Sequence, residues 1–176
     1  MPLPVAHGLL GATLVAAVRP DAGGRRYYLP LAAGALLANA PDLDFALVFA
    51  LHSRAWHRGF THSFSFALVV CLVFFFALGG RRARAAAGYG LAYASHSVLD
   101  FVTTKFGGGV ELLWPFSAER FALGWRGLSE LPSRLPPAEV ARALCVEFAL
   151  FAPPLLVLLL LRRRAAARRP LTRDAR

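Results

Sequence analysis

Cysteine and charge are both scarce in this 176-residue chain, which has two cysteines and only 17% charged residues. Cys71 and Cys145 both lie inside apolar runs and form no metal-binding spacing motif, so neither a structural zinc finger nor a disulfide framework is expected. Internal repeats and long low-complexity regions are also absent from the sequence. The length leaves room for a single domain.

The first apolar stretch lacks the basic residues that precede the core of a secretory signal peptide. Its first positive charges, Arg19, Arg25 and Arg26, follow the stretch instead. Because basic residues favour the cytoplasmic side of a span, this order predicts an uncleaved membrane span with the N-terminus outside.

Apolar residues make up 57% of the chain, and its mean hydropathy is +0.51. They come in long blocks with few charges, which is typical of transmembrane helices of ~20 residues. The sequence predicts an all-α, polytopic membrane helix bundle over residues 1–161, with spans near 3–18, 27–51, 64–79, 85–104 and 140–161. The alternative is four spans with a re-entrant first segment, which leaves the orientation of everything after residue 27 unchanged. Pro41 interrupts the second of these five segments and is expected to break its helix, since proline cannot donate a backbone hydrogen bond.

The net charge of +10 does not indicate a nucleic-acid partner, because the arginines lie between and after the apolar blocks. Thirteen basic residues fall in 19–27, 80–84 and the tail of 162–176, against seven in the alternate loops 52–63 and 105–142. Cytoplasmic loops carry the excess of basic residues, so the first set is predicted to lie in the cytoplasm. The C-terminus is then cytoplasmic as well.

The extramembrane parts are predicted to interact with lipid. Residues 105–139 form the largest loop, on the outer side, and its aromatic residues Trp114, Phe116 and Trp125 are expected to anchor it at the headgroups. The basic tail of 162–176 is expected to bind anionic lipid and is assigned no chemistry. Membrane lipids are therefore the predicted partners.

Most of the histidines and aspartates fall in four short clusters, all of which the predicted topology places near the outer membrane face. Random placement would scatter such residues over both faces. The clusters are the N-terminal His7, the PDLD that contains Asp42 and Asp44, the HRGFTH that contains His57 and His62, and the SHSVLD that contains His96 and Asp100.

The spacing inside these clusters suits a common site. His96 and Asp100 are four residues apart, which places them one above the other on a single helix face. Tyr89, Tyr93 and Thr103 continue the same polar stripe, which is expected to face the bundle interior.

His57 and His62 are five residues apart, which fits a loop leading into a helix better than one helix face. Thr61 is a candidate cap for the start of that helix. His52 is near this group but lies outside its motif, and we interpret it as a surface residue.

Ionisable groups within membrane spans cost ~2.5–3.5 kcal/mol each and are functional by default. Each candidate alone has a structural explanation, since Asp42 or Asp44 could merely cap a helix. Together the three aspartates would repel one another in a partly dry pocket, and a divalent cation offsets that repulsion. Imidazole with carboxylate suits zinc, with iron or manganese as alternatives. Seven candidate ligands exceed the four of one tetrahedral zinc, so two or three ions are predicted.

These motifs resemble the YdjM-like family of inner-membrane, metal-dependent hydrolases. The resemblance covers about the first 120 residues, through His7, PDLD, HRGFTHS, SHSVLDFVTT and LLWPFS. It implies an inner-membrane location and a distant similarity to zinc-dependent phospholipases C, whose histidine and aspartate ligands include an H-x-x-x-D pair on a helix. His96 and Asp100 match that pair. Those enzymes also use a glutamate, for which Glu111 is a weak candidate.

The predicted function is metal-dependent hydrolysis of a phosphoester or a lipid-linked substrate by metal-activated water. Asp44 is the predicted general base, and Arg58, between ligands, is predicted to hold a phosphate oxygen. Two alternatives use the same residues. The chain could be a small transporter or ion-binding protein, or a structural membrane protein in which metal only fixes the bundle.

Overall fold

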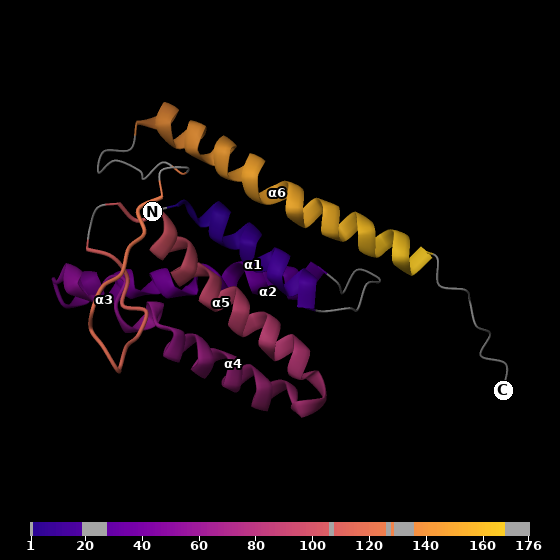
Figure 1. Ribbon diagram of the computed structural model, residues 1–176, viewed down its shortest axis with the longest axis horizontal. Helices are drawn as coiled ribbons and strands as arrows, with labels where there is room; N and C mark the ends of the chain where they lie inside the picture. Colours follow the sequence, from indigo (N-terminus) through magenta and orange to yellow (C-terminus); the bar gives the residue numbers. More distant parts are fainter. Residues whose placement is uncertain (1, 19–27, 106–107, 126–127, 129–135, 168–176) are drawn as a thin grey trace.

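The computed structural model describes residues 2–18, 28–105, 108–125, 128 and 136–167 of the chain (Figure 1). This part of the chain is helical and contains no β-strand, only an isolated antiparallel bridge between Val110 and Phe121. The predicted all-α class is therefore confirmed.

In the described part of the chain, six α-helices follow the apolar segments of the sequence closely. They are α1 (Pro4–Val18), α2 (Tyr28–Leu37), α3 (Phe45–Ala50), α4 (Phe64–Leu78), α5 (Ala83–Thr103) and α6 (Pro137–Ala167). Short 3-10 turns join them at Ala40–Asp44, Arg54–Trp56, Phe60–His62 and Gly80–Arg82.

Pro41 breaks the second segment as predicted. Helix α2 ends at Leu37, and the chain continues through the 3-10 turn Ala40–Asp44, in which Pro41 occupies one of the first positions. A proline is tolerated there because the first residues of a helical turn have no intrahelical acceptor for their N–H groups. The turn carries two aspartates out of the helical line of α2, toward the end of α5.

Not every predicted span is long and apolar enough to cross a membrane by itself. In the described residues one helix meets both conditions, at Pro137–Ala165. Two bent pairs meet them together, namely Tyr28–Leu37 with Ala40–Ala50 at 46° and Arg54–His62 with Phe64–Leu78 at 51°. The structure thus supports between one and three spans, and the five predicted spans are not confirmed. Helix α1, with 15 residues, is shorter than the ~20 residues that a span needs.

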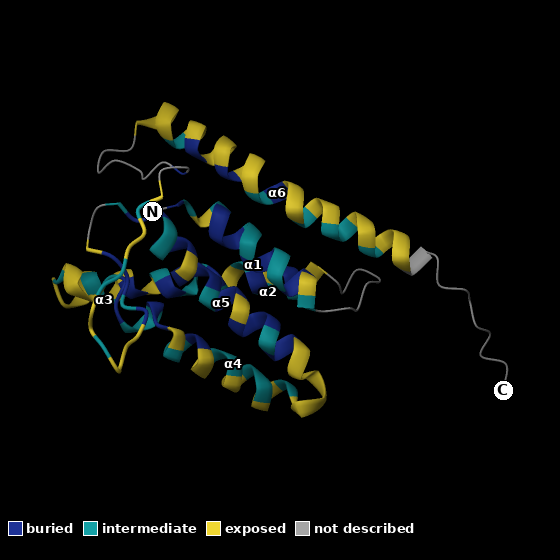
Figure 2. Cartoon of the chain, in the orientation of Figure 1, coloured by how far each residue is buried: buried dark blue, intermediate teal, exposed yellow. Residues whose placement is uncertain are grey.

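Helix α1 lies at the centre of the bundle and packs against α2, α5 and α6 (Figure 1). Helices α1 and α6 run in the same direction. Glu147, in the first half of α6, contacts the start of α1, and Arg162, in the second half of α6, donates a hydrogen bond to the carbonyl oxygen of Ala17 near the end of α1. The outward face of α6 is exposed along its length (Figure 2). It carries leucines such as Leu156 and Leu160 that suit a lipid environment.

Glycines allow α1 and α2 to pack closely. A Cβ atom added at Gly11 would lie 2.5 Å from the carbonyl oxygen of Gly34 and 2.4 Å from Cβ of Ala38. A Cβ atom added at Gly34 would lie 2.5 Å from Cγ2 of Val15. Small residues at such contacts let two helix backbones approach, a common device of membrane bundles.

We predict that Gly11→Ala destabilises the bundle, although alanine is the better helix former. The added methyl group would meet backbone atoms that cannot rotate away, and overpacking of this kind costs about 1–3 kcal/mol. Thermal unfolding of the detergent-purified protein, followed by circular dichroism, should show a lower midpoint. Gly88→Ala is the matched control, because its Cβ would meet α1 only at ordinary distances of 3.6 Å or more. Equal midpoints for the two variants would contradict the close contact.

Candidate metal centre

The structure brings all seven predicted ligand residues to one end of the bundle. His7 comes from the second turn of α1, while His96 and Asp100 come from the last turns of α5. The other four come from the segments that precede α3 and α4, and are Asp42, Asp44, His57 and His62. We call these seven residues the His/Asp cluster. Five of its side chains are buried, and those of Asp42 and His57 are 19% and 18% exposed, so the cluster is open on that side.

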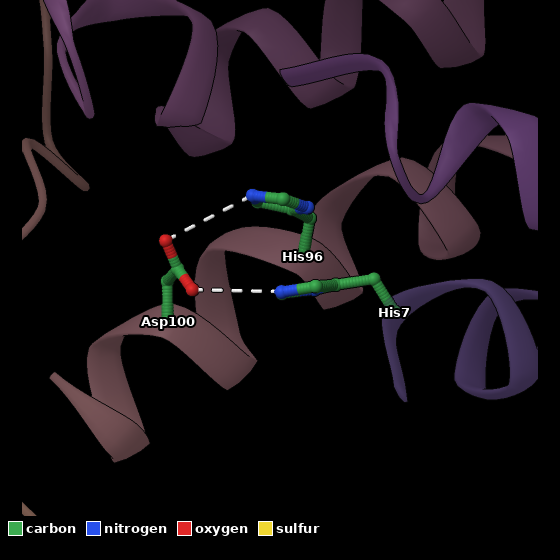
Figure 3. A group of neighbouring side chains, drawn as sticks. All are labelled: His7, His96 and Asp100. Atoms are coloured by element: carbon green, nitrogen blue, oxygen red, sulfur yellow. Dashed lines mark ion pairs between the residues drawn. The ribbon is translucent and has the colours of Figure 1, made fainter. Parts of the chain in front are cut away.

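The inner part of the cluster is formed by α1 and α5 (Figure 3). The rings of His7 and His96 stack with their centroids 3.9 Å apart, and both direct Nε2 toward the carboxylate of Asp100. Nε2 of His7 lies 3.6 Å from Oδ1 of Asp100, and Nε2 of His96 lies 3.8 Å from Oδ2. As predicted, the polar stripe of α5 faces the interior, since Tyr89, Tyr93, His96, Asp100 and Thr103 are all buried.

Asp42 and His62 join this inner part to the loop. Oδ1 of Asp42 lies 3.4 Å from Nε2 of His96 and 3.7 Å from Nε2 of His62. Nε2 of His62 also lies 3.9 Å from Oδ2 of Asp100. These separations are longer than hydrogen bonds, and they leave a small space bounded by two imidazole nitrogens and two carboxylate oxygens.

Most of the atoms that face this space have no hydrogen-bond partner. The unpartnered buried atoms include both ring nitrogens of His7, Nε2 of His62 and His96, Oδ1 of Asp42, and both carboxylate oxygens of Asp100. Buried polar atoms are nearly always hydrogen-bonded, because leaving one unpartnered costs free energy. Nε of Arg58 lies 3.2 Å from Oδ2 of Asp100 and is a cationic donor beside these atoms. An arrangement with more lone pairs than one guanidinium can satisfy fits a bound cation.

The cluster contains three overlapping groups whose ligand atoms lie within 4.8 Å of one another. They are His7 with His96 and Asp100, Asp42 with His62 and His96, and Asp42 with Asp44 and His57. His96 belongs to the first two groups and Asp42 to the last two. These groups could each hold a cation, although neighbouring groups share a residue.

In His96 and His62, contacts at Nδ1 leave Nε2 as the ring nitrogen that could bind a metal. Nδ1 of His96 lies 2.7 Å from the carbonyl oxygen of Ala38. A carbonyl only accepts, so Nδ1 carries the proton and the neutral ring presents a lone pair at Nε2. Nδ1 of His62 lies 3.1 Å from Oγ1 of Thr61 and 3.4 Å from Oδ2 of Asp44. Metal-binding histidines are commonly oriented by such partners.

Asp44 holds the loop that carries His57 and His62. Its Oδ1 lies 3.0 Å from Nδ1 of His57, and its Oδ2 accepts hydrogen bonds from the backbone N–H of Arg58 at 2.9 Å and from the hydroxyl of Thr61 at 3.3 Å. The prediction that Thr61 caps the following helix is wrong. Ser63 caps α4 instead, because its side chain accepts a hydrogen bond from the N–H of Phe66 and the hydroxyl of Thr61 is directed at Asp44.

Arg58 lies against the cluster in an unusual backbone conformation. Its φ of 59° is in the left-handed region, which non-glycine residues rarely adopt and which costs about 1–3 kcal/mol. The side chain is buried, and its Nε lies 3.2 Å from Oδ2 of Asp100. The left-handed turn therefore directs a guanidinium group at a carboxylate that the histidines also face.

Known proteins resemble this chain over most of its length. The chain matches the YdjM inner membrane protein family over residues 1–166. It belongs to that family. It is also 42% identical over 113 residues to "Inner membrane protein YbcI" of Escherichia coli (strain K12), a match that covers 60% of this chain and 64% of that protein. The chain thus spans just under two thirds of the curated relative. No solved structure matches the chain.

Family membership confirms the predicted family and the inner-membrane class of this protein. Two supporting residues of this YdjM family member, Glu147 and Arg120, were not predicted from the sequence, and for Tyr93 only the burial was predicted and not its hydrogen bond. Glu147 of α6 accepts hydrogen bonds from the start of α1, Arg120 donates to the carbonyl oxygens of Ala55 and His57, and Tyr93 donates to that of Thr61. These contacts join residues far apart in the sequence, so no local pattern indicates them.

Two sequence interpretations of single residues can be compared with the structure. His52 is exposed and outside the cluster, as predicted. Glu111, the weak candidate for a glutamate ligand, instead accepts hydrogen bonds from Nε and Nη2 of Arg120 and belongs to none of the three groups in the described residues. Its carboxylate is neutralised there by the guanidinium, so its place near the loop is structural.

We predict that zinc stabilises this YdjM family member through the cluster. A ligand present at a hundredfold excess over its dissociation constant adds about 2.7 kcal/mol, which corresponds to a rise of roughly 5–10 °C in the unfolding midpoint for a chain of this size. His96→Ala should lose most of that rise, since His96 belongs to two of the three groups. His52→Ala, the exposed control, should retain it. An equal rise in both variants would place zinc elsewhere on the protein.

Proposed function

We propose that this inner-membrane protein is a metal-dependent hydrolase that acts on a phosphoester or a lipid-linked substrate. The observation that carries the proposal is the set of unpartnered imidazole nitrogens and carboxylate oxygens that converge at one end of the bundle. Perturbed and unpaired ionisable groups gathered in this way are typical of functional sites. The resemblance to metal-dependent hydrolases supports the same assignment.

The donor set favours zinc, with two or three ions. All seven candidates are imidazoles or carboxylates, a combination that suits zinc and, less specifically, iron or manganese. Asp42 belongs to two of the three groups, and its carboxylate has two oxygens with which it could bridge neighbouring ions. His96 also belongs to two groups, but it presents only Nε2 and could bind one ion at a time. Divalent ions held there would polarise the scissile bond and make a bound water acidic enough to act as a nucleophile near neutral pH.

Arg58 is proposed to bind an anionic oxygen of the substrate. Its guanidinium already lies beside Asp100, at the edge of the space that the histidines face. A guanidinium group offers several donors in one plane, which matches the oxygens of a phosphoryl group. Its strained backbone is consistent with a functional position, because strain of this kind gathers at active sites.

The general base is proposed among the aspartates. Asp44, the residue predicted from the sequence, has a carboxylate that already accepts bonds from the segment of residues 57–61, which favours a role in holding His57 and His62. Asp42 has an unpartnered oxygen and a partly exposed side chain, but it also belongs to two of the three ligand groups, so it could act as base only through an oxygen that binds no ion. The two roles are separable by mutation.

A lipid-linked substrate is favoured by the surroundings of the opening. Leu43, next to Asp42, is exposed, as are Phe49 of α3 and Trp114 and Phe116 of the loop. Phe116 is 89% exposed, which is unusual for phenylalanine in water but ordinary at a membrane interface. An acyl chain could lie against these residues while the headgroup enters the cluster.

The same geometry supports an outer-leaflet site with the N-terminus outside and the C-terminus in the cytoplasm. The arginine-containing turn between α4 and α5 and the end of α6 lie at the opposite end of the bundle from α3 and the start of α1 (Figure 1). Basic residues favour the cytoplasmic side. The cluster end would then face outward.

Hydrolysis is favoured over transport because the polar groups do not continue through the bundle. Beyond the cluster, α1, α2 and α5 share a buried hydrophobic core that contains Ala12, Val15, Ala16, Leu31, Tyr89 and Ala92. A transport path would need polar groups or water along its length. An apolar core favours a site that is reached from one side.

We predict that the purified protein hydrolyses a fluorescent phospholipid or a chromogenic phosphodiester in mixed micelles, and that a chelator abolishes this activity. Zinc should restore it in the wild-type protein and in His52→Ala, but not in Asp100→Ala, whose missing carboxylate faces His7, His62 and His96. The loss should exceed the roughly 10–100-fold that follows the removal of a residue that only supports a metal ligand. Zinc flux into proteoliposomes without hydrolysis of any such substrate would instead support the transporter.

A further inference from the structure

Glu147 is a buried carboxylate that the proposed chemistry does not use. It is the only charged residue of α6 between Arg142 and Arg162, in the apolar part of the helix that meets the criteria for a membrane span. Its exposed fraction is 2%. A charged group is costly in such a position, so its partners indicate what it does.

Both oxygens of Glu147 bind the start of helix α1. Oε1 accepts a hydrogen bond from the backbone N–H of Leu3 at 2.6 Å, and Oε2 accepts one from that of Ala6 at 3.2 Å. The N–H of Ala6 is shared, since it also lies 3.1 Å from the carbonyl oxygen of Leu3, which precedes the helix. The first N–H groups of a helix have no carbonyl partner within the helix, and the helix dipole makes this end positive. A carboxylate supplied by another helix satisfies both requirements.

The residue that follows Ala6 is His7. The place of its ring in the cluster depends on the position of α1, because no hydrogen bond within the described residues holds the ring itself. Neither of its nitrogens has a hydrogen-bond partner, whereas the Nδ1 atoms of His57, His62 and His96 each have one. His7 is held by its backbone and by stacking on His96. A small shift of the start of α1 would therefore move its Nε2 away from Asp100.

Helix α6 contacts α1 at both ends in agreement with the helix dipole. Glu147 binds N–H groups at the start of α1, and Arg162 donates to the carbonyl oxygen of Ala17 near the end, at 2.9 Å. The anion is at the positive end and the cation at the negative end. The pair fixes the position of α1 along α6 as well as its distance from it.

We propose that Glu147 is a positioning residue that holds the start of α1 so that His7 enters the His/Asp cluster. The inference rests on the proposed function only in counting His7 as a metal ligand. Its geometric part, that Glu147 keeps the His7 ring buried against His96 and Asp100, can be tested without metal.

The test is labelling of histidines with diethyl pyrocarbonate in the metal-stripped, detergent-purified full-length protein, measured for each peptide by mass spectrometry. In Glu147→Leu, which removes both acceptors and leaves α6 more apolar, labelling of His7 should rise about tenfold, the effect expected from losing a helix cap. Glu147→Gln keeps one acceptor oxygen and should give an intermediate rise. His96 should remain protected in both, and exposed His52 should react fully in every sample.

Glu139→Gln is the matched control, because it removes an exposed carboxylate from the first turn of the same helix. It should leave His7 as protected as in the wild-type protein. If His7 stays protected in Glu147→Leu, or if His96 becomes labelled to the same extent as His7, Glu147 does not position His7 and the proposal is overturned.

A second measurement separates this inference from the proposed function. If the cluster binds zinc, Glu147→Leu and His7→Ala should weaken zinc binding to a similar extent, and the double variant should be no weaker than His7→Ala, since both remove the same ligand. Additive losses would overturn the positioning role. If the wild-type protein binds no divalent ion, the proposed function fails, while the labelling result still decides the role of Glu147.

Discussion

The structure depends on the burial of ionisable groups that have too few partners of their own. Three aspartates and four histidines meet at one end of an apolar bundle, and the atoms that face one another there are mostly acceptors or lone pairs. Acceptors without donors repel, and the surrounding protein is a poor substitute for water. We propose that a divalent cation offsets this repulsion, together with the guanidinium of Arg58 that already lies beside Asp100.

The elements that build the cluster are those that break the helical pattern. The turn at Pro41 brings Asp42 and Asp44 to the end of α5, and the turns before α4 bring His57 and His62 opposite them. Irregular backbone at membrane depth is tolerated only where it is buried in protein or lines a polar cavity, so breaks and a polar site belong together. The long helices then act as a scaffold, with α6 holding the start of α1.

The sequence was sufficient to predict the helical segments, the break at Pro41 and the convergence of the candidate ligands, because each leaves a local pattern of period, proline or spacing. The sequence was not sufficient to predict the number of membrane spans. Helix α1 is too short and α5 too polar for length and hydropathy to show whether they cross the membrane. The sequence also could not indicate Glu147 or Arg120, whose partners are distant in the sequence. The cap of α4 was assigned to Thr61 because the competing bond to Asp44 is a tertiary contact.

The central claim is that the His/Asp cluster is a metal centre, and the measurement closest to it is the metal content of the protein as it is made by the cell. Elemental analysis of protein purified in detergent without chelator should find at least one equivalent of zinc or another divalent transition metal for each chain. The same preparation of Asp100→Ala should contain much less. Wild-type protein that is folded, as judged by its helical circular dichroism, and that contains no divalent metal above the level of the buffer would contradict the account.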